Sequence, residues 1–245
     1  MFSAVLDACV LFPQSLRDVL LRLAAAEFYA PLWSERILEE MRSNLVDARG
    51  IDPEKADRTV LLMREAFEEA DVQMVKIASL EPVMTNDEKD RHVLATAVAA
   101  GSELVVTFNL QDFPRAACEP VGVSAVHPDE FLRDLLDLEA ETVYRVIAEL
   151  VANLRETNFD QFLEMLKRAG VLPSWPRSRP TRSADFATGD SESLANGLRH
   201  AGFRLDEQQL ASGSDPGSLE RTGPPPRDRR CWSRRAARRQ APQAC

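Results

Sequence analysis

Residues 86–112 read NDEKDRHVLATAVAAGSELVVTFNLQD. Apolar residues recur at helical spacing in the first part, so a helix is predicted to begin at Asn86 or Asp87 and to end before Gly101. The apolar segment 104–107 then predicts a strand that leads into a polar turn. A helix followed directly by a buried strand is typical of a parallel α/β sheet.

The rest of the first 126 residues repeats this alternation of strand and helix. Ser15 and Asp18 have the spacing of a capping box at the start of one predicted helix, and Ser34 is the expected N-cap of the next. Further strands are predicted at 4–6, 28–32, 72–77 and 121–126, and further helices at 15–26, at 34–46 and after Pro53. The pattern therefore predicts one α/β domain over residues 1–126.

Two segments of different character follow this domain. Residues 127–172 predict a helical extension, because apolar residues recur at helical spacing after Pro128. Residues 173–245 are rich in Arg, Pro, Ser and Gly, a composition that predicts disorder. The segment 177–245 holds 13 Arg, no Lys and 8 Asp or Glu, a net charge of +5 that leaves −14 on residues 1–176. This tail either binds RNA through its charge or is an extension without function, since its abrupt change in composition resembles translation in a shifted reading frame.

Composition limits the class of protein. The chain is 44% hydrophobic, and no apolar run approaches the roughly 18 residues needed to cross a bilayer. The N-terminus lacks the basic segment of a signal peptide, so a cytoplasmic protein is expected. The four cysteines show no zinc-ligand spacing, and Cys9 and Cys118 are expected to be small buried residues.

Oxygen-bearing side chains stand at the ends of two predicted strands. Asp7 comes after the strand at 4–6, and Asn109 and Asp112 come after the strand at 104–107. In open α/β sheets, binding sites form at the carboxyl ends of the strands. Each of these residues alone also fits an ordinary turn, but together their oxygens suit a hard cation.

Asp90 has an unusual position for a helix acid. At about 100° per residue it falls within the apolar face that includes Val93 and Ala97. A carboxylate turned toward the core needs a partner or a cation, although an acid near a helix N-terminus also gains from the helix dipole. Asp87 is interpreted as the helix cap. His92 points away from the apolar face of this helix and is interpreted as a surface residue.

Three stretches of the sequence resemble PIN-domain proteins. They are the strand that ends in Asp7, the stretch 90–97 and the stretch 106–114, and the resemblance covers about residues 1–126. It is closest to the VapC-like toxins of bacterial toxin–antitoxin pairs, some of which carry an extension similar to the helical region that follows. The resemblance implies a three-layer α/β/α fold with a central parallel sheet, Mg²⁺ or Mn²⁺ as cofactor, and endonucleolytic cleavage of RNA.

The resemblance also implies a further acid on an early helix. Glu39 and Glu40 are the candidates, and Glu40 is preferred because it lies nearer the apolar face of its helix. Thr107 and Asn109 are expected to support the acids, although the family often has Asp where this chain has Asn109. The implied catalytic acids are Asp7, Glu40, Asp90 and Asp112. Asp7, Asp90 and Asp112 are also the expected metal ligands.

A toxin of this kind implies two protein partners, a cognate antitoxin and a second copy of the chain. An alternative is a catalytically inactive PIN-like module that binds RNA or regulates another protein, with acids kept for the fold. Haloacid-dehalogenase-like phosphatases also place Asp after a first strand. That family has a second Asp two residues later, where this chain has Cys9, so the phosphatase reading is disfavoured.

Overall fold

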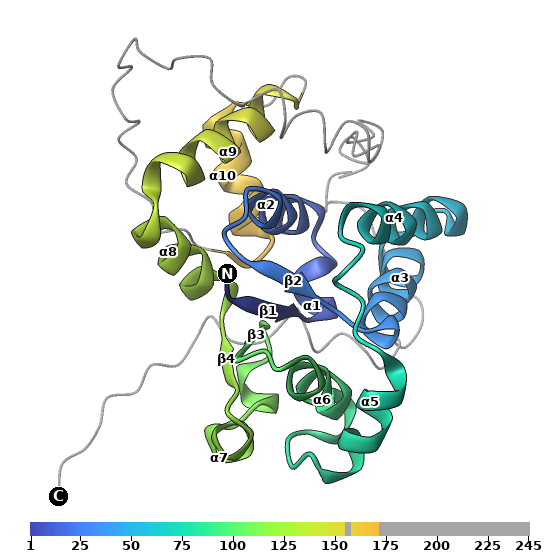
Figure 1. Ribbon diagram of the computed structural model, residues 1–245. Helices are drawn as coiled ribbons and strands as arrows, with labels where there is room; N and C mark the ends of the chain where they lie inside the picture. The colour runs from blue at the N-terminus through green and yellow to red at the C-terminus, as the bar shows by residue number, and fades with distance from the viewer. Residues whose placement is uncertain (155–157, 172–245) are drawn as a thin grey trace, which may run out of the picture.

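Four short strands form a parallel sheet at the centre of the molecule (Figure 1). This computed structural model describes residues 1–154 and 158–171. The strands are β1 (Ser3–Leu6), β2 (Ala30–Leu32), β3 (Leu104–Val106) and β4 (Ser124–Val126), in the order β2-β1-β3-β4. Because Leu6 pairs with Val106, the next residues of β1 and β3 leave the sheet at the same edge.

Helices cover both faces of this sheet, which confirms the predicted three-layer arrangement (Figure 1). On one side, α2 contacts β2, and on the other α6 contacts β1 and β3. The helices of this part are α1 (Ala8–Leu11), α2 (Gln14–Ala25), α3 (Glu35–Arg49), α4 (Pro53–Ala66), α5 (Met74–Leu80), α6 (Arg91–Ala100) and α7 (Arg115–Cys118). Short 3₁₀ turns, among them Glu88–Asp90 and Leu110–Asp112, connect the elements around the sheet edge.

Three further helices follow β4: α8 (Pro128–Leu138), α9 (Ala140–Ala152) and α10 (Phe159–Arg168). Both α9 and α10 contact α2, and Phe131 of α8 meets the ring of Tyr29 edge-on at 4.9 Å between centroids. Beyond α10, Gly170 has φ +88° and lies against the ring of Phe108, which follows β3. The predicted helical extension is therefore present, and it reaches the carboxyl edge of the sheet. The predictions for residues 172–245 lie outside the described residues.

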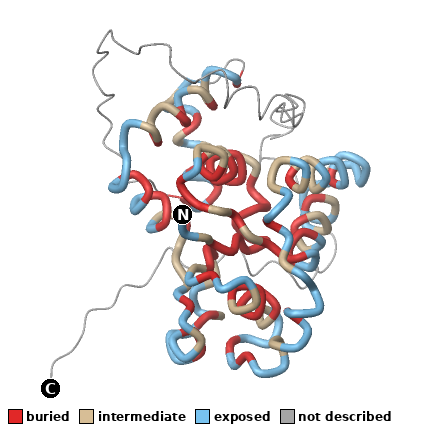
Figure 2. Tube along the Cα trace, viewed as in Figure 1, coloured by how far each residue is buried: buried red, intermediate tan, exposed pale blue. Residues whose placement is uncertain are grey.

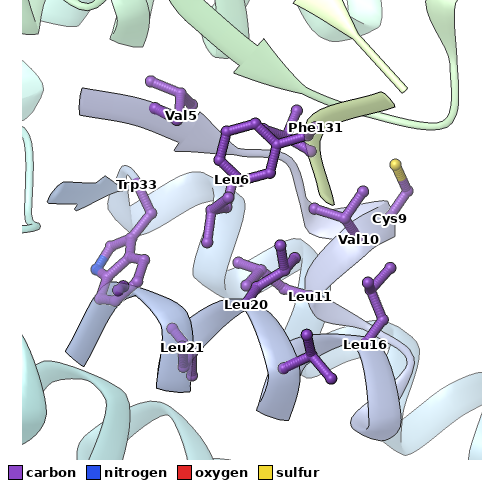
Figure 3. Packing of buried hydrophobic residues seen from close by; sticks show 14 of the residues in the cluster. Val5, Leu6, Cys9, Val10, Leu11, Leu16, Leu20, Leu21, Trp33 and Phe131 are labelled. Carbon is purple, nitrogen blue, oxygen red and sulfur yellow. The ribbon is translucent and has the colours of Figure 1, made fainter. Parts of the chain in front are cut away.

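The core forms on both sides of β1 (Figure 2). Ala4, Val5 and Leu6 are completely buried, as expected for a strand covered on both faces. Figure 3 shows the side chains of β1, α1 and α2 packed together, with Leu6, Leu11 and Leu20 among them. In the part of the chain that the structure describes, no helix is both long and apolar enough to span a membrane.

Two predictions of local structure are wrong. The segment 72–77 is not a strand; most of it belongs to α5, and only a single bridge between Trp33 and Asp71 extends the sheet there. Ser15 and Asp18 do not form a capping box, because α2 begins one residue earlier, after Pro13, and Asp18 is buried within the helix. The predicted caps at Ser34 and Gly101 are confirmed, since Ser34 accepts a hydrogen bond from Ile37 N–H and Gly101 is left-handed.

Candidate active site

Asp7 stands at the carboxyl end of β1 and is only 3% exposed. Its backbone N–H donates to Val106 O at 3.1 Å, which ties it to the end of β3. The Thr107 hydroxyl donates to Asp7 Oδ2 at 2.6 Å, and the Cys9 thiol donates to the same oxygen at 3.1 Å. Burial raises the pKa of Asp7, the two hydrogen bonds oppose that rise, and the charge of Glu40 adds to it.

The segment after β3 brings further polar groups to this edge. Thr107 is fully buried, and its Oγ1 accepts a hydrogen bond from Asn109 N–H at 3.0 Å while donating to Asp7. The Asp112 N–H donates to Asn109 O, and Asp112 O accepts from Asp87 N–H. Burial and the charges of Asp87 and Asp7 raise the pKa of Asp112. One hydroxyl therefore links the acid after β1 to the turn after β3.

Asp90 lies at the start of α6 and is half-buried. Its pKa is raised to about 7, first by burial and then by the negative charges of Asp7 and Asp112. The predicted inward orientation of Asp90 thus places it in the same electrostatic environment as the two strand-end acids. The neighbouring Asp87, predicted to cap the helix, instead caps the 3₁₀ turn that leads into it, through a hydrogen bond from Lys89 N–H, and α6 itself begins at Arg91.

The two candidate glutamates of α3 lie in different surroundings. The Glu40 side chain is 39% exposed, and its Oε1 is 3.4 Å from His92 Nε2 and 3.4 Å from Arg36 Nε. Glu39 is 63% exposed and pairs with Arg42, along the groove between α3 and α4. The structure therefore brings Glu40 toward the acids of the sheet edge, whereas Glu39 faces α4.

His92 is a correction to the sequence prediction, because it is not a surface residue. Its side chain is 1% exposed, and the ring is near enough to Asp7 and Asp90 to interact electrostatically with both. The interpretation failed because α6 is buried on more than one face: six consecutive residues, His92 to Ala97, are buried. The absence of charged residues over 92–100 was a signal for this, since a surface helix normally carries them.

Cys9 makes hydrogen bonds at this edge that the sequence analysis did not predict. It is buried as expected, but its sulfur does more than fill space. Besides donating to Asp7, Sγ accepts a hydrogen bond from Phe108 N–H at 3.3 Å. Sequence reasoning missed this contact because Cys9 and Phe108 follow two different strands and are far apart in the sequence.

The donor set at this edge fits a divalent cation. Carboxylate and amide oxygens are the ligands of hard cations, and acids that raise one another's pKa are stabilised when a cation lies between them. The buried Nε2 atom of His92 has no hydrogen-bond partner and is directed toward Glu40. Within residues 1–154 and 158–171, no three Asp, Glu, His or Cys side chains form a ready-made metal-binding group.

Comparison with known proteins finds matches to two parts of the chain. Residues 3–111 match the PIN domain, and residues 128–172 match the VapC50 C-terminal domain. The chain is similar to "Putative ribonuclease VapC50" of Mycobacterium tuberculosis, at 50% identity over 68 residues, which is 28% of this chain and 40% of that relative. The match thus spans less than half of the relative's length. No solved structure matches the chain. Two consecutive parts of the chain are therefore similar to known domains: the α/β part to the PIN domain, over residues 3–111, and the helical part to the VapC50 C-terminal domain, over residues 128–172.

Proposed function

We propose that the chain is a Mg²⁺- or Mn²⁺-dependent endoribonuclease and acts as the toxin of a toxin–antitoxin pair. The observation that carries this proposal is the raised pKa of Asp90, about 7, which Asp7 and Asp112 help to cause. Three acids from separate elements that repel one another at the carboxyl edge of a parallel sheet are costly for the fold. A function that uses a cation there accounts for that cost, and the similar VapC50 protein is named a ribonuclease.

Each residue of the site has a distinct task in this proposal. Asp7 presents Oδ1 to the cation, because Thr107 and Cys9 both bind Oδ2 and fix the plane of the carboxylate. Asp90 and Asp112 complete the set of metal ligands by rotation of their side chains. A bound divalent cation would activate a water and neutralise the charge that develops on the phosphate.

The other side chains orient the reacting groups. Glu40 lies on α3 across from these acids, where its carboxylate can hold the proton of the attacking water. Asn109 provides a neutral amide oxygen, which lowers the total negative charge next to a phosphate. The expected products are a 5′-phosphate and a 3′-hydroxyl.

Adjacent glutamates give a matched test of this site. Glu40→Gln should lower RNA cleavage in Mn²⁺ by about 100-fold or more, since a side chain that accepts a proton during the reaction contributes about 10²–10⁴-fold to the rate. Glu39→Gln changes the same atoms one residue earlier on α3 and should cleave like the unsubstituted chain. Asp90→Asn should also lose cleavage. Full activity in Glu40→Gln and Asp90→Asn would refute the assigned roles.

A calorimetric titration with Mn²⁺ separates the enzyme from an inactive binding module. The enzyme takes up Mn²⁺ at a site that Asp7→Asn abolishes, whereas an inactive module shows no such uptake. Sequencing both ends of RNA cut by the purified chain would then identify the products and the preferred sequence.

The proposed toxin has two protein partners. A cognate antitoxin is expected to cover the acidic edge, and a second copy of the chain is expected to form a homodimer. Light scattering across a range of concentrations tests the homodimer, and a monomer at every concentration would refute it. Protection of the Asp7 region from hydrogen exchange in a purified complex tests the antitoxin's position.

A further inference from the structure

We propose that His92 is a nitrogen ligand of the divalent cation, through its Nε2 atom and next to Glu40. This rests on the proposed function and adds a ligand of a different chemical type to the acids. It rests on three observations: the hydrogen bond of Nδ1, the burial of Nε2 without a hydrogen-bond partner, and the distance from Nε2 to Glu40.

The hydrogen bond of the imidazole determines which nitrogen is free to bind an ion. Nδ1 lies 2.9 Å from Lys89 O, and because a carbonyl oxygen only accepts, Nδ1 must donate. In the neutral ring, Nε2 then carries a lone pair. A histidine that binds a metal almost always donates its other ring N–H to a carboxylate, a backbone carbonyl or water. His92 already has this arrangement.

Nε2 is in surroundings that lack a donor. The side chain is 1% exposed, and Nε2 makes no hydrogen bond in the structure. The nearest charged group is an acceptor, Glu40 Oε1, at 3.4 Å. A buried lone pair that faces a carboxylate oxygen is unfavourable, and a cation between the two atoms removes that cost.

The distance between these two atoms suits a shared metal ion. Neighbouring ligand atoms about 2.1 Å from an octahedral Mg²⁺ or Mn²⁺ ion lie about 3.0 Å apart. Nε2 and Oε1 lie 3.4 Å apart, so a small rotation of the Glu40 side chain brings them to that spacing. The imidazole ring is near enough to Asp7 and Asp90 to interact electrostatically with both, which places it beside the expected ligands.

An imidazole ligand changes which metal the site prefers. Oxygen ligands suit Mg²⁺, whereas imidazole favours transition metals. A site that combines carboxylates with His92 therefore selects Mn²⁺ over Mg²⁺. His92→Gln should reduce this selectivity by about tenfold, measured as the ratio of the two dissociation constants.

Electron spin echo envelope modulation of the Mn²⁺-loaded full chain tests the ligand directly. A bound imidazole produces a nitrogen coupling, which changes when the histidines are labelled with ¹⁵N. The chain has three histidines, at 92, 127 and 200, so few variants are needed. His127→Gln is the matched control, because His127 caps α8 and packs against Phe108. The coupling should persist in His127→Gln and disappear in His92→Gln.

Each alternative result has a definite meaning. Mn²⁺ that binds in an Asp7-dependent way without nitrogen coupling would overturn the role of His92 and leave the proposed nuclease site intact. Coupling that survives in His92→Gln would also overturn it. If the unsubstituted chain and Asp7→Asn take up Mn²⁺ equally, or neither takes it up, the metal site of the proposed function itself is refuted. If His92→Gln fails to fold, the isotope comparison in a chain that carries both His127→Gln and His200→Gln, and so keeps only His92, still decides.

Discussion

Asp18 makes the stability of this fold depend on pH in a way that Asp18→Asn should remove. The carboxyl group is 5% exposed within α2, next to Arg17 and Arg22. Burial raises its pKa to about 6, and the two arginines offset only part of that effect. Arg22 also interacts with the charge of Glu149 on α9, so this cluster lies between the PIN domain and the C-terminal helices.

The size and sign of the effect follow from the difference in pKa between the two states. The pKa of Asp18 is 3.8 in the unfolded chain and about 6 in the fold, a difference worth about 3 kcal/mol. Because the folded pKa is the higher one, the folded state binds the proton more tightly. Asp18 therefore stabilises the fold below about pH 4, and this contribution is lost as the pH rises through about 6.

Urea unfolding at a series of pH values measures this contribution. The free energy of unfolding of Asp18→Asn minus that of the unsubstituted chain should increase by about 3 kcal/mol between about pH 4 and about pH 7. Asp137→Asn removes a carboxylate from the exposed face of α8 and is the control for the loss of a surface charge. A flat difference for Asp18→Asn would refute the account of its burial.

The Thr107 hydroxyl, the Gly170 backbone and the metal each give a further measurable prediction. Thr107→Val removes a donor to Asp7 and should weaken Mn²⁺ binding by about 10- to 100-fold in a calorimetric titration, whereas Thr107→Ser should bind normally; equal affinities would contradict this. Gly170→Ala should lower the free energy of unfolding by about 1–3 kcal/mol, because φ is +88° and a Cβ would lie 3.2 Å from Phe108 Cε1. Gly50→Ala, with φ +64° and nothing within 4 Å, should cost only about 1 kcal/mol, and equal losses in denaturant unfolding would exclude a steric effect. EDTA should abolish RNA cleavage and excess Mn²⁺ should restore it, while cleavage in EDTA would contradict the metal dependence.

The sequence was most informative where a single periodicity governs a segment. The alternation of strands and helices predicted the parallel sheet, and the position of Asp90 on its helix predicted that it turns inward. The same method failed for His92. Placing residues at about 100° intervals assumes that a helix has one buried face, whereas α6 is buried on more than one face. Burial on the second face comes from elements distant in sequence, which a local pattern does not contain.

The errors at 72–77 and at Ser15 have a related cause. Apolar β-branched residues suit both a strand and a short buried helix, and only the packing of α5 on α6 decides between them. Ser15 and Asp18 have the correct spacing for a capping box, but Pro13 already provides the entry to α2. Asp18 then lies in the helix interior, where tertiary contacts override local preference.

The contact between Gly170 and the ring of Phe108 has a consequence for the order in which the domain is completed. Phe108 stands between the acids of the sheet edge and the end of the C-terminal helices, and its backbone N–H also donates to Cys9. On the ribosome, residues 1–126 are synthesised before Gly170 exists, so the sheet can form while this ring still lacks its support. The segment that carries Asp112 is therefore among the last parts of the molecule to be fixed during translation.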